Sequence, residues 1–130
     1  CKPLAAFDVS VATTRMDELV TRLRACLTQA FPSQQHLFFG HLGDGNLHLI
    51  SGNFAGHDDV VRAEEMVYAI VGEFQGSISA EHGIGTVKRP FLHHSRTHEE
   101  LRLMQQLKGL IDPHNILNPG RVLPEIRTRP

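Results

Sequence analysis

One short turn signal constrains the fold of this chain more than any other feature. The segment Gly-Asp-Gly-Asn at residues 43–46 separates two apolar runs, at residues 37–39 and 47–50. An Asp-Gly pair between strand-like runs is typical of a two-residue type I′ turn, which reverses the chain into an antiparallel hairpin. The sequence therefore predicts a β-hairpin, and with it at least part of an antiparallel sheet.

The same turn sets the register of the predicted hairpin. With Asp44 and Gly45 as the two central residues of the turn, His41 lies directly opposite His48. Directly opposed residues have Cβ atoms about 5 Å apart. The sequence therefore predicts two imidazoles side by side on one face of the sheet.

Apolar residues in the flanking segments follow two different periods. Residues 7–11 show the period of two that is typical of a half-buried strand, and a short strand is also expected at residues 77–80. Helical spacing of apolar residues predicts helices over residues 14–30 and 58–74. The complete order is strand, helix, strand, strand, helix, strand. It predicts an α+β fold of the ferredoxin-like split βαβ type, an antiparallel sheet with helices on one face.

The C-terminal part of the chain is predicted to hold a further helix and an extended arm. Thr97 and Glu100 have the spacing of a capping box, which places the start of a helix here. The helix is expected to end before Pro113, since the residue before a proline disfavours the helical conformation. Residues 113–130 then form an irregular arm that is apolar enough to need a partner surface. Residues 1–130 are expected to be a single domain.

Charge and cysteine content argue against several classes of protein. Thirteen Lys and Arg residues against fourteen Asp and Glu residues leave a net charge of −1, without the basic stripe typical of nucleic-acid-binding domains. No apolar run is as long as a transmembrane helix requires. Cys1 and Cys26 form neither a zinc-finger spacing nor a disulfide framework, so the cytoplasm is the expected location. Nine histidines are unusual, because imidazole is the commonest metal-binding side chain.

His41, His48 and Glu81 are the first candidate site. The predicted hairpin brings the two imidazoles together, and Glu81 follows the strand expected at residues 77–80. Two histidines and one carboxylate with an open position suit a divalent ion such as zinc. The simpler explanation is that all three are solvated hairpin and loop residues. Spacing alone does not decide between these two interpretations.

His82 is the second candidate. It precedes Gly83 and Gly85, whose conformational freedom allows another molecule to approach the backbone closely. A histidine in such a place can act as a general base. Equally, it can be a polar residue that fills a glycine-rich turn. The glycines match neither of the phosphate-binding patterns GxGxxG and GxxxxGK[ST], which argues against a nucleotide-binding loop.

Several segments together resemble the signatures of one protein family. They are residues 40–48 (Gly-His-Leu-Gly-Asp-Gly-Asn-Leu-His), residues 79–85 (Ser-Ala-Glu-His-Gly-Ile-Gly), the pair Asp112-Pro113, and residues 116–121 (Ile-Leu-Asn-Pro-Gly-Arg). In this order they resemble the C-terminal domain of FAD-linked oxidases of the D-lactate dehydrogenase, glycolate oxidase and D-2-hydroxyglutarate dehydrogenase type. The resemblance covers about residues 6–124, which is nearly the whole chain.

The resemblance implies a role for each candidate residue. His41, His48 and Glu81 resemble the ligands of the family's divalent metal, usually zinc in the dehydrogenases. This metal binds the carboxylate and the 2-hydroxyl group of the substrate and lowers the pKa of the hydroxyl as a Lewis acid. His82 resembles the general base that takes the hydroxyl proton while a hydride passes from the substrate to the flavin of FAD.

The resemblance also implies contacts outside this set. Residues 8–11 with Arg15 resemble the start of the family's last substrate-domain module, which makes Arg15 a candidate substrate-binding residue. Asn118 lies in the arm that touches the FAD cofactor in the family. Two positions depart from the hydroxyglutarate-oxidising members: Ala6 replaces a lysine that anchors the substrate, and Ile50 replaces an asparagine. Both replacements remove a polar contact, so a smaller or more apolar 2-hydroxy acid is expected as substrate.

The leading hypothesis is the C-terminal, substrate- and metal-binding part of an FAD-dependent dehydrogenase that oxidises a D-2-hydroxy acid to a 2-oxo acid. The family's FAD-binding domain precedes this part and is absent from the sequence. We therefore expect the isolated chain to be inactive and to self-associate through the apolar face meant for that domain. Two alternatives remain open: a self-contained metallohydrolase with the same His, His and Glu site, and a non-catalytic ferredoxin-like binding module.

Overall fold

The computed structural model of the chain describes residues 3–123, and it is built around one antiparallel sheet. Strand β1 spans Leu4–Ser10, β2 spans Gln35–His41 and β3 spans Asn46–Gly52. The strand order across the sheet is β1-β3-β2, so the strand that comes last in the chain lies in the middle. Both of its neighbours run antiparallel to it.

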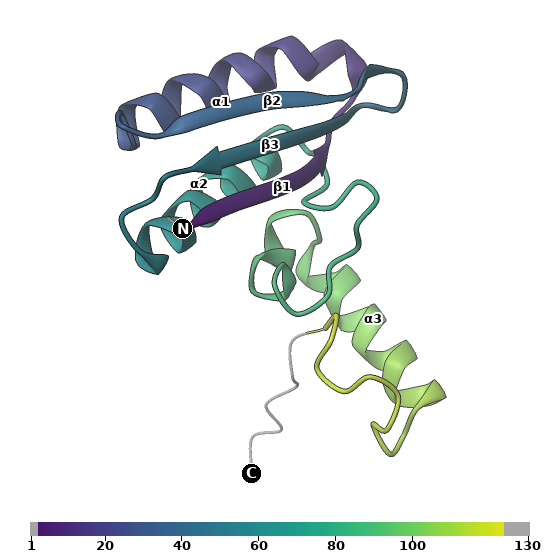
Figure 1. The fold of residues 1–130 in the computed structure, drawn as a ribbon. Coiled ribbons are helices and arrows are strands. Elements are labelled where there is room, and N and C mark those ends of the chain that lie inside the picture. The colour runs from purple at the N-terminus through teal and green to yellow at the C-terminus, as the bar shows by residue number, and fades with distance from the viewer. Residues whose placement is uncertain (1–2, 124–130) are drawn as a thin grey trace.

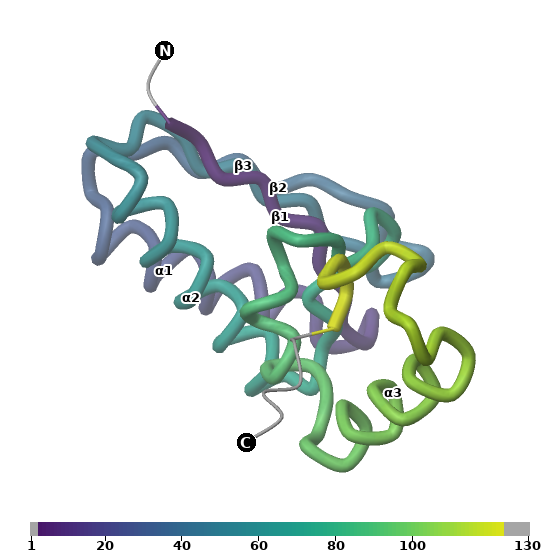
Figure 2. Tube along the Cα trace, turned by 90° about the horizontal axis from the view of Figure 1, so that it is seen from below, coloured from purple at the N-terminus to yellow at the C-terminus, as the bar shows by residue number. Residues whose placement is uncertain are grey.

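Two helices cover one face of this sheet, as Figures 1 and 2 show. Helix α1 spans Met16–Ala30 after a short 3₁₀ turn, η1, at Thr13–Arg15. Helix α2 spans His57–Glu73. Both agree with the predicted ranges to within two residues. The mixed structure, with helices on one face of an antiparallel sheet, confirms the predicted α+β, ferredoxin-like fold class.

The core lies between these helices and the sheet. Apolar residues four apart on α1 and alternate residues of β1 and β3 point into the same space, as their spacing predicts. Residues of this core that are completely buried include Val9, Leu19, Leu23, Leu27, Leu49, Val67 and Val71. Within residues 3–123 no helix covers the other face of the sheet, so polar side chains on it remain available to form a site.

The turn between β2 and β3 is longer than the predicted two-residue turn. Leu42–Asp44 form a short 3₁₀ helix, η2, and Gly45 follows in the left-handed conformation, with a φ of 70°. A Cβ atom at Gly45 would lie 2.2 Å from the carbonyl oxygen of Val11. Glycine is therefore needed where the turn packs against the end of β1.

The longer turn changes the register of the hairpin. His41 lies opposite Asn46, and His48 lies opposite Phe39. The predicted pairing of His41 with His48 is therefore wrong. The shift of two residues preserves the face from which each side chain leaves its strand. The two imidazole rings consequently still touch, with their centroids 5.4 Å apart.

The strand predicted at residues 77–80 is not a strand of the sheet. Ser77 makes one isolated bridge to Ser10, at the outer edge of β1, where a fourth strand of the predicted fold would lie. The N–H of Ala80 still donates to the backbone oxygen of Asp8 at 3.2 Å, but the N–H groups of Ala80, Glu81 and His82 also donate to its side chain. Beyond Ala80 the chain leaves this edge of the sheet.

The C-terminal part of the chain lies apart from the sheet (Figure 1). A 3₁₀ segment, η3, spans Arg89–His94, and helix α3 spans His98–Ile111. The predicted capping box is confirmed: the hydroxyl oxygen of Thr97 accepts from the N–H of Glu100 at 3.2 Å, and the Glu100 carboxylate accepts from the N–H of Thr97 at 2.7 Å.

The predicted arm begins directly after α3. Asp112 accepts hydrogen bonds from the backbone N–H groups of Ile116 and Leu117, at 3.0 and 2.9 Å, which turns the chain back along the helix. Residues 113–123 are irregular, as predicted. The remainder of the predicted arm, residues 124–130, lies outside the described residues.

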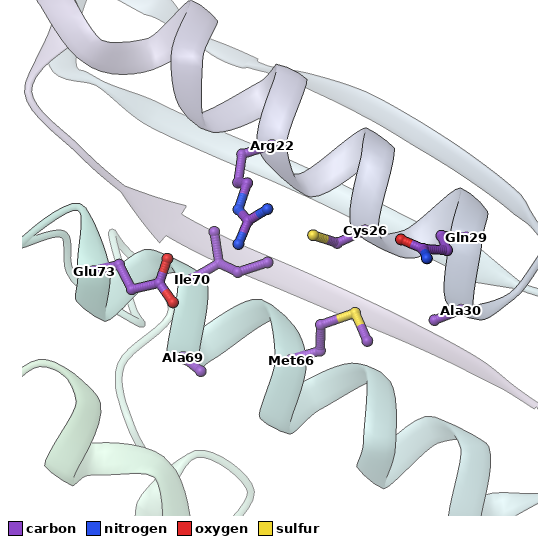
Figure 3. A pocket seen from close by; sticks show the side chains of 8 residues that line it. All are labelled: Arg22, Cys26, Gln29, Ala30, Met66, Ala69, Ile70 and Glu73. Carbon is purple, nitrogen blue, oxygen red and sulfur yellow. The ribbon is translucent and has the colours of Figure 1, made fainter.

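A groove of about 470 Å³ lies between α1 and α2, with the sheet behind it in Figure 3. Its walls carry apolar and charged side chains, with Cys26 and Met66 near its middle and Arg22 and Glu73 toward one end. Cys26 is a free thiol, and Cys1 lies outside the described residues. The groove contains none of the candidate site residues.

Candidate metal centre

Asp8 is the buried anchor of the candidate site. Its neighbours on β1, Phe7 and Val9, point into the core, so its own side chain leaves the face of the sheet that the helices do not cover. Residues 79–88 fold over this side chain and leave only 1% of Asp8 exposed. An ionised side chain buried to this extent needs donors and a counter-charge.

Hydrogen bonds to this carboxylate hold the covering segment in place. Oδ2 of Asp8 accepts from the backbone N–H groups of Ala80, Glu81 and His82, at 3.1, 3.1 and 2.8 Å. The hydroxyl group of Ser79 donates to the same oxygen at 3.2 Å. The backbone of Glu81 and His82 is thereby fixed above the uncovered face of the sheet.

Lys88 supplies the counter-charge. Its ammonium group donates to the backbone oxygen of Asp8 at 3.1 Å and lies 3.4 Å from Oδ2. Burial raises the pKa of Asp8, but the N–H groups of His82 and Glu81 and the charge of Lys88 outweigh burial and lower that pKa to about 2. Burial lowers the pKa of Lys88, and the Asp8 carboxylate opposes this shift. Lys88 is therefore the buried partner of Asp8.

His48, Glu81 and His82 gather around this anchor, and with Asp8 we call them the Asp8 cluster. His48 lies opposite Asp8 in the β1–β3 register, with its Nδ1 4.0 Å from Oδ1 of Asp8. Oε1 of Glu81 lies 3.3 Å from Nε2 of His48 and 3.7 Å from Nε2 of His82. One ligand atom from each of the four residues lies within 4.8 Å of all the others.

The Asp8 cluster becomes more exposed with distance from the sheet. The side chain of His48 is 12% exposed, that of Glu81 51% and that of His82 63%. The N–H, hydroxyl and ammonium donors gather on Oδ2 of Asp8, through which this residue positions the others. Oδ1 accepts one longer bond, from the N–H of Glu81 at 3.4 Å, and faces His48, so Asp8 itself counts among the possible ligands. His48, Glu81 and His82 direct two imidazoles and one carboxylate toward one place. Zinc prefers these donors, with a position left open for substrate, so the residues fit a divalent metal.

Two of the three predicted metal ligands, His48 and Glu81, belong to the Asp8 cluster, and the third does not. His41 lies exposed at the end of β2, where its ring meets the ring of His48 edge-on, at an interplanar angle of 86°. The structure thus places His41 beside the cluster. His82, which was predicted to act as a general base, lies among the possible ligand atoms.

The other two predicted site residues lie elsewhere in the structure. The guanidinium of Arg15 pairs with Glu18 at 3.1 Å and stacks 4.3 Å from the ring centroid of Phe74, near the start of α1. Asn118 is exposed in the arm after α3, with a left-handed φ of 47°. Within residues 3–123, neither side chain makes a hydrogen bond or ion pair with the Asp8 cluster.

Asn46 is a further polar residue at this site, which the sequence did not single out. It lies two residues before His48 on β3, so the two side chains leave the same face of the sheet. Asn46 is buried, and its side-chain oxygen has no hydrogen-bond partner in the part of the chain that the structure describes. A buried oxygen without a hydrogen bond lowers the stability of the folded chain by about 1–3 kcal/mol. A site that is completed by a bound cation or donor explains it.

Comparison with known proteins identifies the family of this chain. Residues 3–122 match the family model described as the C-terminal domain of FAD linked oxidases. The chain belongs to this family. It is 40% identical over 121 residues to a D-2-hydroxyglutarate dehydrogenase of Xanthomonas citri pv. viticola, covering 88% of this chain and 26% of that protein. It is 45% identical over 120 residues to the mitochondrial D-2-hydroxyglutarate dehydrogenase of Bos taurus, and this match covers 91% of this chain and 22% of that protein.

The predicted FAD-linked oxidase family is therefore confirmed. The chain spans about a quarter of the length of the curated relatives it matches, so this domain corresponds to the C-terminal part of longer FAD-linked oxidases. The Bos taurus and Rattus norvegicus relatives are named as mitochondrial, and the predicted cytoplasmic location is not confirmed. In the described part of this FAD-linked oxidase domain, every helix is too short or too polar to cross a membrane.

Asp8 and Lys88 were missed because their roles depend on distant contacts. Asp8 had one usable signal: it is an acidic residue between apolar neighbours in a predicted strand. That pattern places its side chain on the polar face of the sheet, but only the folding of residues 79–88 buries it. Lys88 reaches Asp8 across 80 positions of sequence, which no local pattern indicates.

Proposed function

We propose that this domain supplies the substrate and metal site of an FAD-dependent dehydrogenase that oxidises a D-2-hydroxy acid to a 2-oxo acid. The observation that carries the proposal is the convergence of ligand atoms from His48, Glu81 and His82, above the buried Asp8, within 4.8 Å of one another. The convergence occurs on a face of the sheet that no helix covers (Figure 2). Family membership makes FAD the cofactor.

In this proposal His41, His48 and Glu81 hold the divalent ion. His48 and Glu81 already lie 3.3 Å apart, and His41 touches the ring of His48 from the exposed side. Because His41 is exposed, its ring can turn toward the ion without disturbing the core. When bound there, zinc acts as a Lewis acid that lowers the pKa of the substrate's 2-hydroxyl group.

His82 then serves as the general base. Asp8 fixes the backbone N–H of His82 at 2.8 Å, and the imidazole is 63% exposed beside Glu81, so a substrate bound to the ion could reach it. The proton of the 2-hydroxyl passes to a ring nitrogen of His82, while the hydride on C2 leaves for FAD, which the preceding domain would hold. Asn118 and Arg15 lie outside the Asp8 cluster, so their proposed roles as contacts to FAD and to substrate rest on the family resemblance alone.

The residues beside the Asp8 cluster support a substrate with a short or apolar side chain. Ala6 lies directly opposite Ile50, which in turn lies opposite Leu37, and this row adjoins the pair of Asp8 and His48 on the same face. Leu37 is 61% exposed. D-2-hydroxyglutarate carries a second carboxylate, and the row of Ala6, Ile50 and Leu37 contains no cationic side chain that could bind it. A branched aliphatic 2-hydroxy acid fits this surface better.

The metal site can be tested on the chain itself. After loading with zinc and dialysis against metal-free buffer, elemental analysis should find one ion fewer per chain in His48→Ala and in Glu81→Gln than in the unaltered chain. His98→Ala is the matched control, because His98 is exposed outside the Asp8 cluster, and it should retain all of its zinc. Equal zinc content in all four proteins would contradict the proposal.

The same measurement assigns the third ligand. Loss of the ion in His41→Ala and its retention in His82→Gln support the proposed roles, whereas the opposite result would make His82 the ligand and remove it as the base. In the complete enzyme, His82→Gln should lower kcat by about 10²–10⁴-fold, the usual contribution of a general base. Turnover that does not change would exclude His82 from the reaction.

A further inference from the structure

We propose that Glu65, His93 and His94 form a second divalent-metal site, which fastens η3 to α2. One ligand atom from each of these residues lies within 4.8 Å of the other two. Glu65 lies on α2, on the helical side of the sheet, whereas the Asp8 cluster lies on the uncovered face. The second cluster shares no residue with the first.

The donors of this cluster face one another across two elements. Nε2 of His94 lies 3.1 Å from Oε1 of Glu65, and the rings of His93 and His94 have centroids 4.0 Å apart. A divalent ion placed between them would bind both rings through unprotonated nitrogens, together with the Glu65 carboxylate.

The hydrogen bond of His93 leaves one ring nitrogen, Nε2, free for a metal. Its Nδ1 lies 3.0 Å from the carbonyl oxygen of Pro90, and a carbonyl can only accept, so Nδ1 carries the proton. In the neutral ring, the lone pair is then on Nε2. Histidines that bind metals typically donate their other N–H to a carbonyl or carboxylate in this way, which fixes both tautomer and ring orientation.

The backbone that carries the two histidines is held firmly against α2. Phe91 and Leu92, which precede them in η3, are buried in the core. A Cβ atom on Gly72 of α2 would lie only 2.6 Å from the carbonyl oxygen of His94, so the two segments are packed as closely as a glycine allows. The histidines are therefore not on a flexible surface segment, and little rearrangement is needed before a metal binds.

The donor set identifies the class of ion. Two imidazole nitrogens and one carboxylate oxygen favour zinc over calcium or magnesium, which prefer oxygen ligands. Water would complete the coordination. Because the ion would join α2 to η3, which leads into α3, its main effect is to stabilise the attachment of the C-terminal part of the chain.

The test is a zinc titration by calorimetry on a chain in which His48→Ala and Glu81→Gln have disabled the Asp8 cluster. This double variant should bind one zinc ion. Adding Glu65→Gln should weaken that binding at least about tenfold, since loss of even an outer-shell partner of a metal ligand typically costs about 10–100-fold in affinity. Adding His98→Ala should leave it unchanged. A folded double variant that binds no zinc, or binding that Glu65→Gln does not affect, would overturn the proposal.

A second readout does not depend on any substitution. In the unaltered chain, nitrogen-15 NMR of the imidazole rings should show the Nε2 signals of His93 and His94 shifting when zinc is added. Signals of both residues that stay fixed at saturating zinc would overturn the proposal. If zinc shifts the ring signals of His48 but not those of His93, the second metal site is also excluded. The proposed function of the Asp8 cluster would then still stand.

Discussion

The two parts of this chain are held together by different forces. Residues 3–78 enclose nearly the whole apolar core, and among the later described residues Phe91 and Leu92 are the buried apolar side chains that join it. Helix α3 buries none of its residues. Large apolar side chains are instead exposed along α3 and the arm, among them Leu103, Leu107, Leu110, Ile111, Ile116 and Leu117. The first part has a core of its own, and the second presents an apolar surface suited to a partner.

Polar contacts attach much of the second part to the first. The most buried are those between Asp8, Lys88 and the segment that contains Glu81 and His82. The Asp8 cluster lies at this junction, since β1 and β3 contribute Asp8 and His48, and the later segment contributes Glu81 and His82. The site consequently forms only when the second part is docked on the sheet.

Asp8→Asn should have the largest effect on stability. The substitution leaves the buried ammonium of Lys88 without a counter-charge. It also replaces a carboxylate oxygen by an NH₂ group, which cannot accept hydrogen bonds from the backbone N–H groups around it. Breaking a buried ion pair in this way typically lowers the free energy of unfolding by about 3–5 kcal/mol. Urea unfolding gives the loss directly. Asp17→Asn, at an exposed position in the first turn of α1, is the matched control and should cost under about 1 kcal/mol, the usual size of a charge–helix dipole interaction. Similar losses in the two variants would show that Asp8 does not anchor the junction.

Leucine substitutions in the two parts should give unequal results. Leu23→Ala removes a completely buried side chain of α1 and should cost about 3 kcal/mol. Leu107→Ala removes a side chain of α3 that is 49% exposed and should change the unfolding free energy by under about 0.5 kcal/mol. Thermal or urea unfolding of both variants measures the difference. Equal losses would mean that α3 belongs to the same core as α1.

Acid should weaken the junction over a defined pH range. The pKa of Asp8 is about 2 in the folded chain, below its ordinary value near 4, so its stabilisation is complete above about pH 4. That stabilisation, about 2 kcal/mol, is lost as the pH falls from about 4 to 2. Carbon-13 NMR of the Asp8 carboxyl group should give a midpoint near pH 2. A midpoint near 4 would show that the donors around Asp8 do not favour its ionised form.

Local patterns predicted the elements of this fold better than the contacts between them. Apolar spacing gave α1 and α2 to within two residues, and Thr97 with Glu100 marked the start of α3. The hairpin was predicted but its register was not, since Gly45 packs on Val11 and a four-residue turn results. That packing is a tertiary contact, which the Asp-Gly pair alone does not show.

Only part of the candidate site could be predicted, because tertiary contacts complete it as well. His48, Glu81 and His82 could be singled out from their turns and glycines, and the structure brings them together. His41 was placed by the wrong register and lies beside the cluster. The strand expected at residues 77–80 is reduced to one isolated bridge, at Ser77. The N–H groups of Ala80 and Glu81 donate to the carboxylate of Asp8.

X-ray diffraction at the zinc absorption edge, from crystals of this chain soaked in zinc, tests the metal centre most directly. The anomalous map should show a peak in contact with His48 and Glu81 on the uncovered face of the sheet. The third side chain at that peak, His41 or His82, completes the ligand assignment. A fully soaked crystal with no anomalous peak at His48 and Glu81 would contradict the assignment of the Asp8 cluster as a metal site.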